Sequence, residues 1–171
     1  SNFIPKNIEW IVKATAEAIP KNNIELKYFR NRKTPIFKRS EFLSLITEQF
    51  RTIAIAGTHG KTTTSTIAAH LLYQSQVSCN AFLGGISNNY KTNLLLSKDS
   101  NYVVIEADEY DRSFHQLSPY MAVITSADAD HLDIYGDHSA LKQSFKDFAA
   151  KVSKTLIVRK GLPVEGITFG I

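Results

Sequence analysis

The segment Gly57–Thr63, with the sequence GTHGKTT, contains the residue types that bind a nucleotide triphosphate. Its glycines allow successive backbone N–H groups to turn toward one point, with the positive end of a helix dipole directly behind them. Lys61 supplies a mobile positive charge, and Thr62 supplies a hydroxyl suited to a magnesium ion. The loop is shorter than the common phosphate-binding loop, because Gly57 stands only three residues before Gly60. The alternative, a glycine-rich turn without a ligand, requires all these features to coincide by accident.

Two clusters of polar residues directly follow apolar runs further along the chain. Residues 106–111 follow the run 103–105. A carboxylate that ends a buried strand beside a phosphate loop is typical of a magnesium site, and Glu106 is the best placed. Residues 128–133 place His131 among aspartates, where it can bind a metal, form a hydrogen bond or cap a helix. The four acids of the first cluster also fit a solvated turn, but the phosphate loop upstream favours a metal site.

Alternating strand and helix patterns from Arg51 onward would position these clusters. Continuous apolar runs are typical of strands that are buried on both faces of a parallel sheet. The pattern predicts an α/β domain with a mainly parallel sheet flanked by helices, in which ligands bind beyond the carboxyl ends of the strands. Residues 82–93, with paired glycines followed by Ser, Asn and Thr, predict a flexible polar loop. The predicted strands are 53–56, 103–105, 122–124, 156–158 and 167–169, and the predicted helices contain 67–72 and 141–152.

The first fifty residues form a different unit. Strands are predicted at 8–12 and 35–37, and a helix at 24–30 with Asn22 or Asn23 as its cap. A second helix is predicted to open at Ser40-Glu41. Two strands and two helices make a thin core, so we expect this unit to be the tail of a domain.

The composition is that of a globular protein. Of 171 residues, 43% are hydrophobic and 21% are charged, which suits one domain or one domain plus a piece of another. The single cysteine, Cys79, excludes an internal disulfide framework, and we expect it to fill space. The net charge is +4, and the basic run 27–39 is interpreted as a solvated face rather than a nucleic-acid site. No apolar stretch reaches the ~20 residues of a membrane span, so we expect a cytoplasmic protein with no membrane partner.

Four segments of the chain together form a family pattern: Gly57–Thr63, the loop Gly84–Asn93, the acidic run Glu106–Glu109 and the pair Asp130–His131. They resemble the central, ATP-binding domain of the Mur ligases. The resemblance implies a P-loop NTPase-like central domain at residues 51–171 that is incomplete. It also implies that residues 1–50 are the C-terminal part of the UDP-substrate domain. The C-terminal domain that receives the amino acid is expected to be absent.

The resemblance implies an ATP-dependent, magnesium-dependent ligase of peptidoglycan biosynthesis. The pattern is closest to the branch that joins L-alanine to UDP-N-acetylmuramate through an acyl phosphate. One alternative is the recycling branch, which attaches a whole peptide, because its acidic run also continues into Tyr and Asp, as Tyr110 and Asp111 do here. Another alternative is a non-catalytic nucleotide-binding module. We expect this chain on its own to be inactive in ligation.

The resemblance also implies roles for single residues. Lys61 and the loop backbone would neutralise the β- and γ-phosphates, Thr62 and Glu106 would hold one magnesium ion, and His131 would hold a second metal ion. Lys91 stands where glycine is expected. The implied catalytic residues are Lys61, Glu106 and His131; the nucleotide-binding residues are Gly57, Thr58, His59, Gly60, Lys61, Thr62 and Thr63; the candidate substrate contacts are His59, Asn93, Asp108 and Glu109.

Overall fold

The computed structural model describes residues 8–13, 19–20, 22–108, 113–128 and 138–170. The chain divides into two compact units, Ser1–Ile46 and Thr47–Ile171. The division falls inside helix α2 (Arg39–Gln49), close to the end of the first predicted unit. None of the described helices has the length and apolar character that a membrane span requires.

In the first unit, strands β1 (Ile11–Lys13) and β2 (Ile36–Lys38) pair in parallel. Helix α1 (Ile24–Asn31) begins after Asn23, whose side-chain oxygen accepts a hydrogen bond from the N–H of Leu26 at 3.0 Å. The cap is therefore the second of the two predicted asparagines. At the start of α2, the Glu41 carboxylate accepts a hydrogen bond from the N–H of Lys38 at 2.7 Å, which accounts for the predicted helix start. The assignment of this unit to a UDP-substrate domain stays a prediction.

The second unit is built on a mainly parallel sheet with the strand order β5-β4-β6-β3-β7-β8-β9 among the described residues. Every adjacent pair is parallel except β4 and β5. Ala56 at the end of β3 is in register with Ala107 of β6 and Ile124 of β7, so the segments after these three strands leave the sheet at one edge. The strands are β3 (Arg51–Ala56), β4 (Asn80–Phe82), β5 (Leu94–Leu95), β6 (Tyr102–Ala107), β7 (Met121–Ile124), β8 (Thr155–Arg159) and β9 (Ile167–Phe169).

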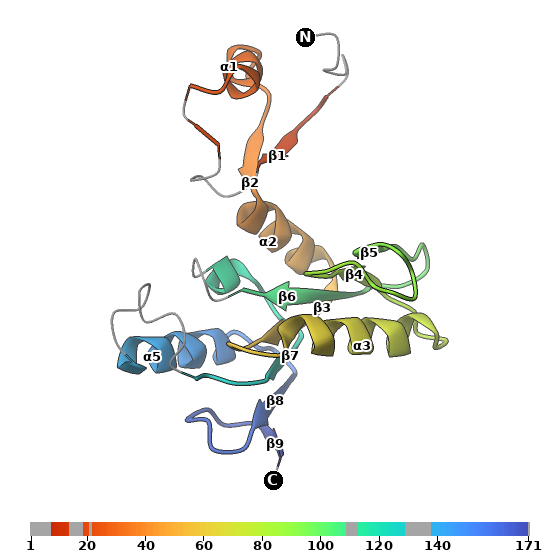
Figure 1. Ribbon diagram of the computed structural model, residues 1–171, viewed down its shortest axis with the longest axis vertical. Helices are drawn as coiled ribbons and strands as arrows, with labels where there is room; N and C mark the ends of the chain where they lie inside the picture. The colour runs from red at the N-terminus through yellow and green to blue at the C-terminus, as the bar shows by residue number, and fades with distance from the viewer. Residues whose placement is uncertain (1–7, 14–18, 21, 109–112, 129–137, 171) are drawn as a thin grey trace. The chain divides into compact units, whose positions relative to one another are not determined.

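Helix α3 (Lys61–Tyr73) lies along the central strands (Figure 1). It contributes Ala69 to a buried apolar cluster that includes Ile55 of β3 and Val104 of β6. Of the apolar residues that predicted this helix, Ile67 and Leu71 are exposed.

A second buried cluster joins two helices of the same unit. Phe114 of the 3-10 helix η1 (Ser113–Gln116) stacks on Phe148 of α5 (His138–Ala149), with ring centroids 5.0 Å apart. It also packs edge-to-face against Phe145, and all three rings are buried. Helix α5 ends at Ala149, so it does not reach Val152, the last residue of the predicted helix.

The segment predicted as a flexible polar loop is the connection of a short β-hairpin between β4 and β5, two strands that the sequence did not predict. The N–H of Leu83 donates to the carbonyl of Asn93 at 2.9 Å, and the N–H of Ser87 donates to the carbonyl of Thr92 at 2.9 Å. Lys91 has φ = 55°, a left-handed conformation that favours glycine. The expectation of glycine at this position thus matches the backbone that the chain adopts.

Cys79 is fully buried, and its thiol donates to the carbonyl of Ala69 at 3.5 Å. Burial raises the pKa of this thiol from its ordinary 9.0 to about 11. We expect iodoacetamide at about pH 8 to leave the native thiol unlabelled and to label it fully in denaturant, because only the thiolate reacts. Mass spectrometry of both samples checks this, and equal labelling rates would contradict the burial.

The same pKa shift makes the free energy of unfolding depend on pH. Because the folded-state pKa of Cys79 lies above the unfolded value, the native state holds its proton more tightly. This stabilising contribution is fully present below pH 9.0 and is lost as the pH rises through about 11.

Candidate active site

The predicted phosphate loop, residues 57–63, consists of residues 57–60, which connect β3 to α3, and the first three residues of α3. Gly57 has φ = +132° and Gly60 has φ = +79°, conformations that favour glycine. A Cβ atom on Gly57 would lie 2.2 Å from the hydroxyl oxygen of Thr125, so this close approach also requires glycine. Gly60 is the N-cap of α3, and within the described residues no side chain caps this helix. Because the first N–H groups of a helix lack intrahelical acceptors, this uncapped end is suited to an anion.

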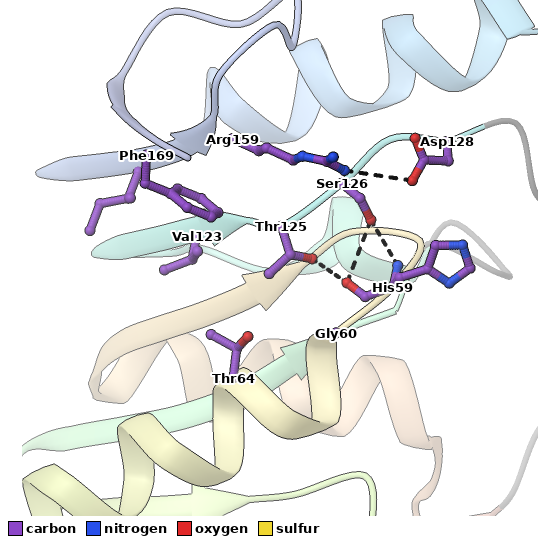
Figure 2. A pocket seen from close by; sticks show the side chains of 10 residues that line it. His59, Gly60, Thr64, Val123, Thr125, Ser126, Asp128, Arg159 and Phe169 are labelled. Carbon is purple, nitrogen blue, oxygen red and sulfur yellow. Dashed lines mark hydrogen bonds and ion pairs between the residues drawn. The ribbon is translucent and has the colours of Figure 1, made fainter. Parts of the chain in front are cut away.

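Two hydroxyl residues that follow β7, Thr125 and Ser126, fasten the loop to the neighbouring strand; we call this pair the Thr125–Ser126 latch. The Ser126 hydroxyl accepts a hydrogen bond from the N–H of His59 at 2.9 Å and lies 2.9 Å from the Thr58 hydroxyl. The Thr125 hydroxyl donates to the carbonyl of Ala56 at 3.0 Å, and it also contacts the carbonyl of His59 (Figure 2). The latch therefore holds both sides of the loop from one strand end.

The Lys61 side chain folds back over the loop. Its Nζ donates to the carbonyl oxygen of Gly57 at 2.8 Å. A phosphate oxygen is a stronger acceptor for an ammonium group than a neutral carbonyl, so a bound phosphate would compete for this donor. The Lys61 amine is thus held next to Gly57, at the start of the phosphate loop.

Glu106 reaches the loop from β6, where it is in register with Ile55 and so lies on the face that α3 covers. Its Oε2 accepts a hydrogen bond from the Thr62 hydroxyl at 3.1 Å. Its Oε1 accepts from the Ser65 hydroxyl at 2.9 Å and from the N–H of Gly84 at 2.7 Å. The structure therefore brings together the two predicted magnesium ligands, one from the loop helix and one from the adjacent strand.

The oxygen atoms of Thr62 and Glu106 fit the preference of Mg²⁺ for a few hard ligands supplemented by water and phosphate. In the described part of the chain, no group of three or more His, Cys, Asp or Glu residues is placed to hold a metal ion. A magnesium ion here would therefore depend on the phosphate oxygens of a nucleotide for part of its coordination.

The other predicted site residues are placed as follows. His59 is exposed at the tip of the loop, and Thr63 is exposed in the first turn of α3. Asp108 follows β6, and its carbonyl accepts from the N–H of Phe114 at 3.2 Å. Asn93 is exposed at the end of the hairpin, far in sequence from the loop. The predicted residues Glu109 and His131 lie outside the described residues.

A cavity of about 510 Å³ lies beside the loop, on the side of β7, β8 and β9. Val123 and Phe169 give it an apolar wall, while Arg159 and Asp128 form an ion pair at 3.9 Å near the loop (Figure 2). Neither Glu106 nor any of the groups bonded to its carboxylate lines this cavity. The cavity thus lies toward β7, β8 and β9, whereas Glu106 reaches the loop from β6, on the other side of β3.

Sequence reasoning missed Ser65, Thr125 and Ser126. Ser65 stands three residues after Thr62, a spacing that places both hydroxyls on one helix face, and this was the only signal for it. The latch residues carried no local signal, because their partners are 66 to 69 positions away in sequence.

Comparison with known proteins identifies close relatives of this chain. A UDP-N-acetylmuramate–L-alanine ligase of Phocaeicola vulgatus is 56% identical over 150 residues, which cover 86% of this chain and 33% of that protein. The protein of the same name from Flavobacterium psychrophilum is 49% identical over 173 residues, covering 99% and 38%. The crystal structure of UDP-N-acetylmuramate–alanine ligase from Thermotoga maritima superimposes with a TM-score of 0.79 at 28% identity, covering 95% of this chain and 39% of that one.

The chain thus spans about a third of the length of the curated relatives that it matches. Residues 55–162 match the family model of the Mur ligase middle domain. This match begins in β3, includes the whole phosphate loop, Glu106 and the latch, and ends after β8. The chain therefore belongs to the Mur ligase family, with residues 55–162 in the middle domain of that family.

Proposed function

We propose that the full-length protein joins L-alanine to UDP-N-acetylmuramate at the expense of ATP, a step of peptidoglycan precursor synthesis. The observation that carries this proposal is the hydrogen bond between Thr62 of the phosphate loop and Glu106 of β6. It joins the predicted phosphate loop to the predicted magnesium ligand at one edge of a parallel sheet. The choice of substrates is supported by the names of relatives that are 46–56% identical.

In the proposed reaction, the loop N–H groups and Lys61 bind the β- and γ-phosphates of ATP. A carboxylate oxygen of the muramoyl group attacks the γ-phosphorus, ADP leaves, and an acyl phosphate forms. The amine of alanine then attacks the acyl carbon, phosphate leaves, and the amine loses a proton as the amide forms. Thr62 and Glu106 would hold Mg²⁺, which when bound offsets negative charge on the phosphates. The contribution of these residues is mainly positioning and charge stabilisation.

Further roles are proposed for residues that stand at the same edge of the sheet or beyond the described parts. His131 is proposed to hold a second metal ion near the acyl phosphate. His59 and Asn93 are proposed to contact the UDP-sugar, with Asp108 and Glu109 as further candidates. Residues 1–50 are proposed to be the C-terminal part of the UDP-substrate domain.

The proposal is tested by measuring phosphate release from ATP by the full-length protein with each acceptor in turn. We expect release to require UDP-N-acetylmuramate and L-alanine together, and the product to carry one added alanine by mass spectrometry. Preference for a tripeptide over alanine would instead assign the protein to the recycling branch. Nucleotide binding that is indifferent to UDP-N-acetylmuramate, with no turnover, would assign it to the non-catalytic module.

A further inference from the structure

We propose that Ser65 is a positioning residue that, together with the backbone N–H of Gly84, sets the orientation of the Glu106 carboxylate so that Oε2 is directed to the metal ion. This inference rests on the proposed function, because it concerns the carboxylate that would hold Mg²⁺. We call the two donors to Oε1, the Ser65 hydroxyl and the Gly84 N–H, the carboxylate clamp.

The Ser65 hydroxyl has two acceptors within reach and one proton to give. It lies 2.9 Å from Glu106 Oε1 and 3.1 Å from the carbonyl oxygen of Thr62. A serine in a helix commonly donates to the carbonyl three or four residues back, which would be a purely structural role. Here the closer acceptor is a carboxylate oxygen, which is a stronger acceptor than a neutral carbonyl. If the hydroxyl proton pointed elsewhere, the hydroxyl oxygen and the carboxylate oxygen would repel each other at 2.9 Å, so Ser65 donates its proton to Glu106.

The clamp occupies one oxygen of the carboxylate. Oε1 accepts two hydrogen bonds, from Ser65 and Gly84, whereas Oε2 accepts one, from Thr62. Each carboxylate oxygen has about two acceptor positions. Oε1 is therefore fully used by the protein, and Oε2 keeps one position beside the Thr62 hydroxyl for a further partner.

The burial of Ser65, one half of the clamp, makes this orientation stiff. Ser65 is fully buried, so its hydroxyl has no water to replace the carboxylate. On the other side, a Cβ atom on Gly84 would lie 2.4 Å from Oε2 and 2.6 Å from Oε1, so a larger residue here would displace the carboxylate. Two consecutive elements, α3 and the β4–β5 hairpin, thus fix one carboxylate.

The test measures ADP binding to the full-length protein by calorimetry at a series of Mg²⁺ concentrations, so it does not depend on turnover. The Mg²⁺ requirement is the Mg²⁺ concentration that gives half of the magnesium-dependent gain in ADP affinity. We expect Ser65→Ala to raise this requirement about 10-fold, the lower end of the effect of removing a partner that orients a metal ligand. ADP affinity without Mg²⁺ should not change. Ser65→Thr, which keeps the hydroxyl, should restore the wild-type requirement.

Ser75→Ala is the matched control, because the Ser75 hydroxyl donates to the carbonyl of Leu72 at 2.7 Å, three residues back, and accepts from the N–H of Val77 at 3.2 Å. Gly84→Ala displaces the carboxylate from an exposed hairpin position, because its Cβ would meet both oxygens, and it should also raise the Mg²⁺ requirement. Ser65→Cys, which keeps a small side chain but offers only a weak S–H donor, should raise the requirement as Ser65→Ala does, and it decides the matter if Ser65→Ala does not fold.

Two outcomes would overturn the inference in different ways. A wild-type Mg²⁺ requirement in folded Ser65→Ala and Gly84→Ala, with Lys61→Ala still weakening ADP binding, rejects the clamp alone. No magnesium dependence in the wild-type protein rejects the proposed function and the clamp together.

Discussion

Replacing Lys61 with alanine is expected to lower the turnover of the full-length protein by about 100- to 1,000-fold, the loss typical of removing one preorganised donor to developing charge. The Nζ of Lys61 is held over the loop by the Gly57 carbonyl, at 2.8 Å, before any phosphate arrives. Alanine removes the charge and leaves the loop backbone in place. Steady-state ADP release at saturating magnesium, ATP and both other substrates measures the effect.

Lys98→Ala serves as the control for this variant, because Lys98 is exposed and lies outside the loop, between β5 and β6. We expect its turnover to match the wild type. Near-normal turnover of Lys61→Ala would reject the assignment of residues 57–63 as the phosphate loop.

Replacing Glu106 has the second large expected effect, a rise of at least about 10-fold in the Mg²⁺ concentration for half-maximal turnover. Glu106→Ala removes the carboxylate and leaves the Ser65 hydroxyl and the Gly84 N–H without their acceptor. Glu106→Gln removes the negative charge but keeps the shape of the side chain. Its amide oxygen can still accept the hydrogen bonds from Ser65 and Gly84, while its amide nitrogen faces the Thr62 hydroxyl. A magnesium titration of each variant measures the shift.

We expect Glu106→Gln to keep the thermal stability of the wild type and to share the raised Mg²⁺ requirement of Glu106→Ala. Glu165→Ala, an exposed change between β8 and β9, should titrate like the wild type. An unchanged titration in both Glu106 variants would remove this residue from the metal site.

The sequence predicted the central strands well because each contains a continuous apolar run, and in Val103–Ile105 that run is buried on both faces. It did not predict β4 and β5. Asn80–Phe82 and Leu94–Leu95 are only three and two residues long, too short for a periodic pattern. β4 pairs with β6, a partner supplied by the tertiary fold, and β5 is added to the sheet through β4.

For the site, Lys61, Thr62 and Glu106 were predicted from their positions at the ends of recognisable elements. The structure places the last two within hydrogen-bond distance. Ser65 and Ser126 were not predicted, because a serine inside a helix or after a strand is common, and its role depends on what packs against it. What sequence reasoning missed is the set of supporting contacts that orients the loop and the carboxylate.

The latch also has a consequence for how the protein is made. Thr58 and Ser126 are 68 positions apart, and β3 has its two neighbours, β6 and β7, in segments that the ribosome adds much later. Pairing of such distant segments is slow and begins only after the later strand has been synthesised. While the nascent chain lacks Ser126, the phosphate loop lacks the hydrogen bonds that Ser126 makes to Thr58 and His59, and the proposed nucleotide site is incomplete. Under the proposed function, binding of ATP would therefore stabilise chains in which the central sheet has assembled through β7 more than it stabilises earlier folding intermediates.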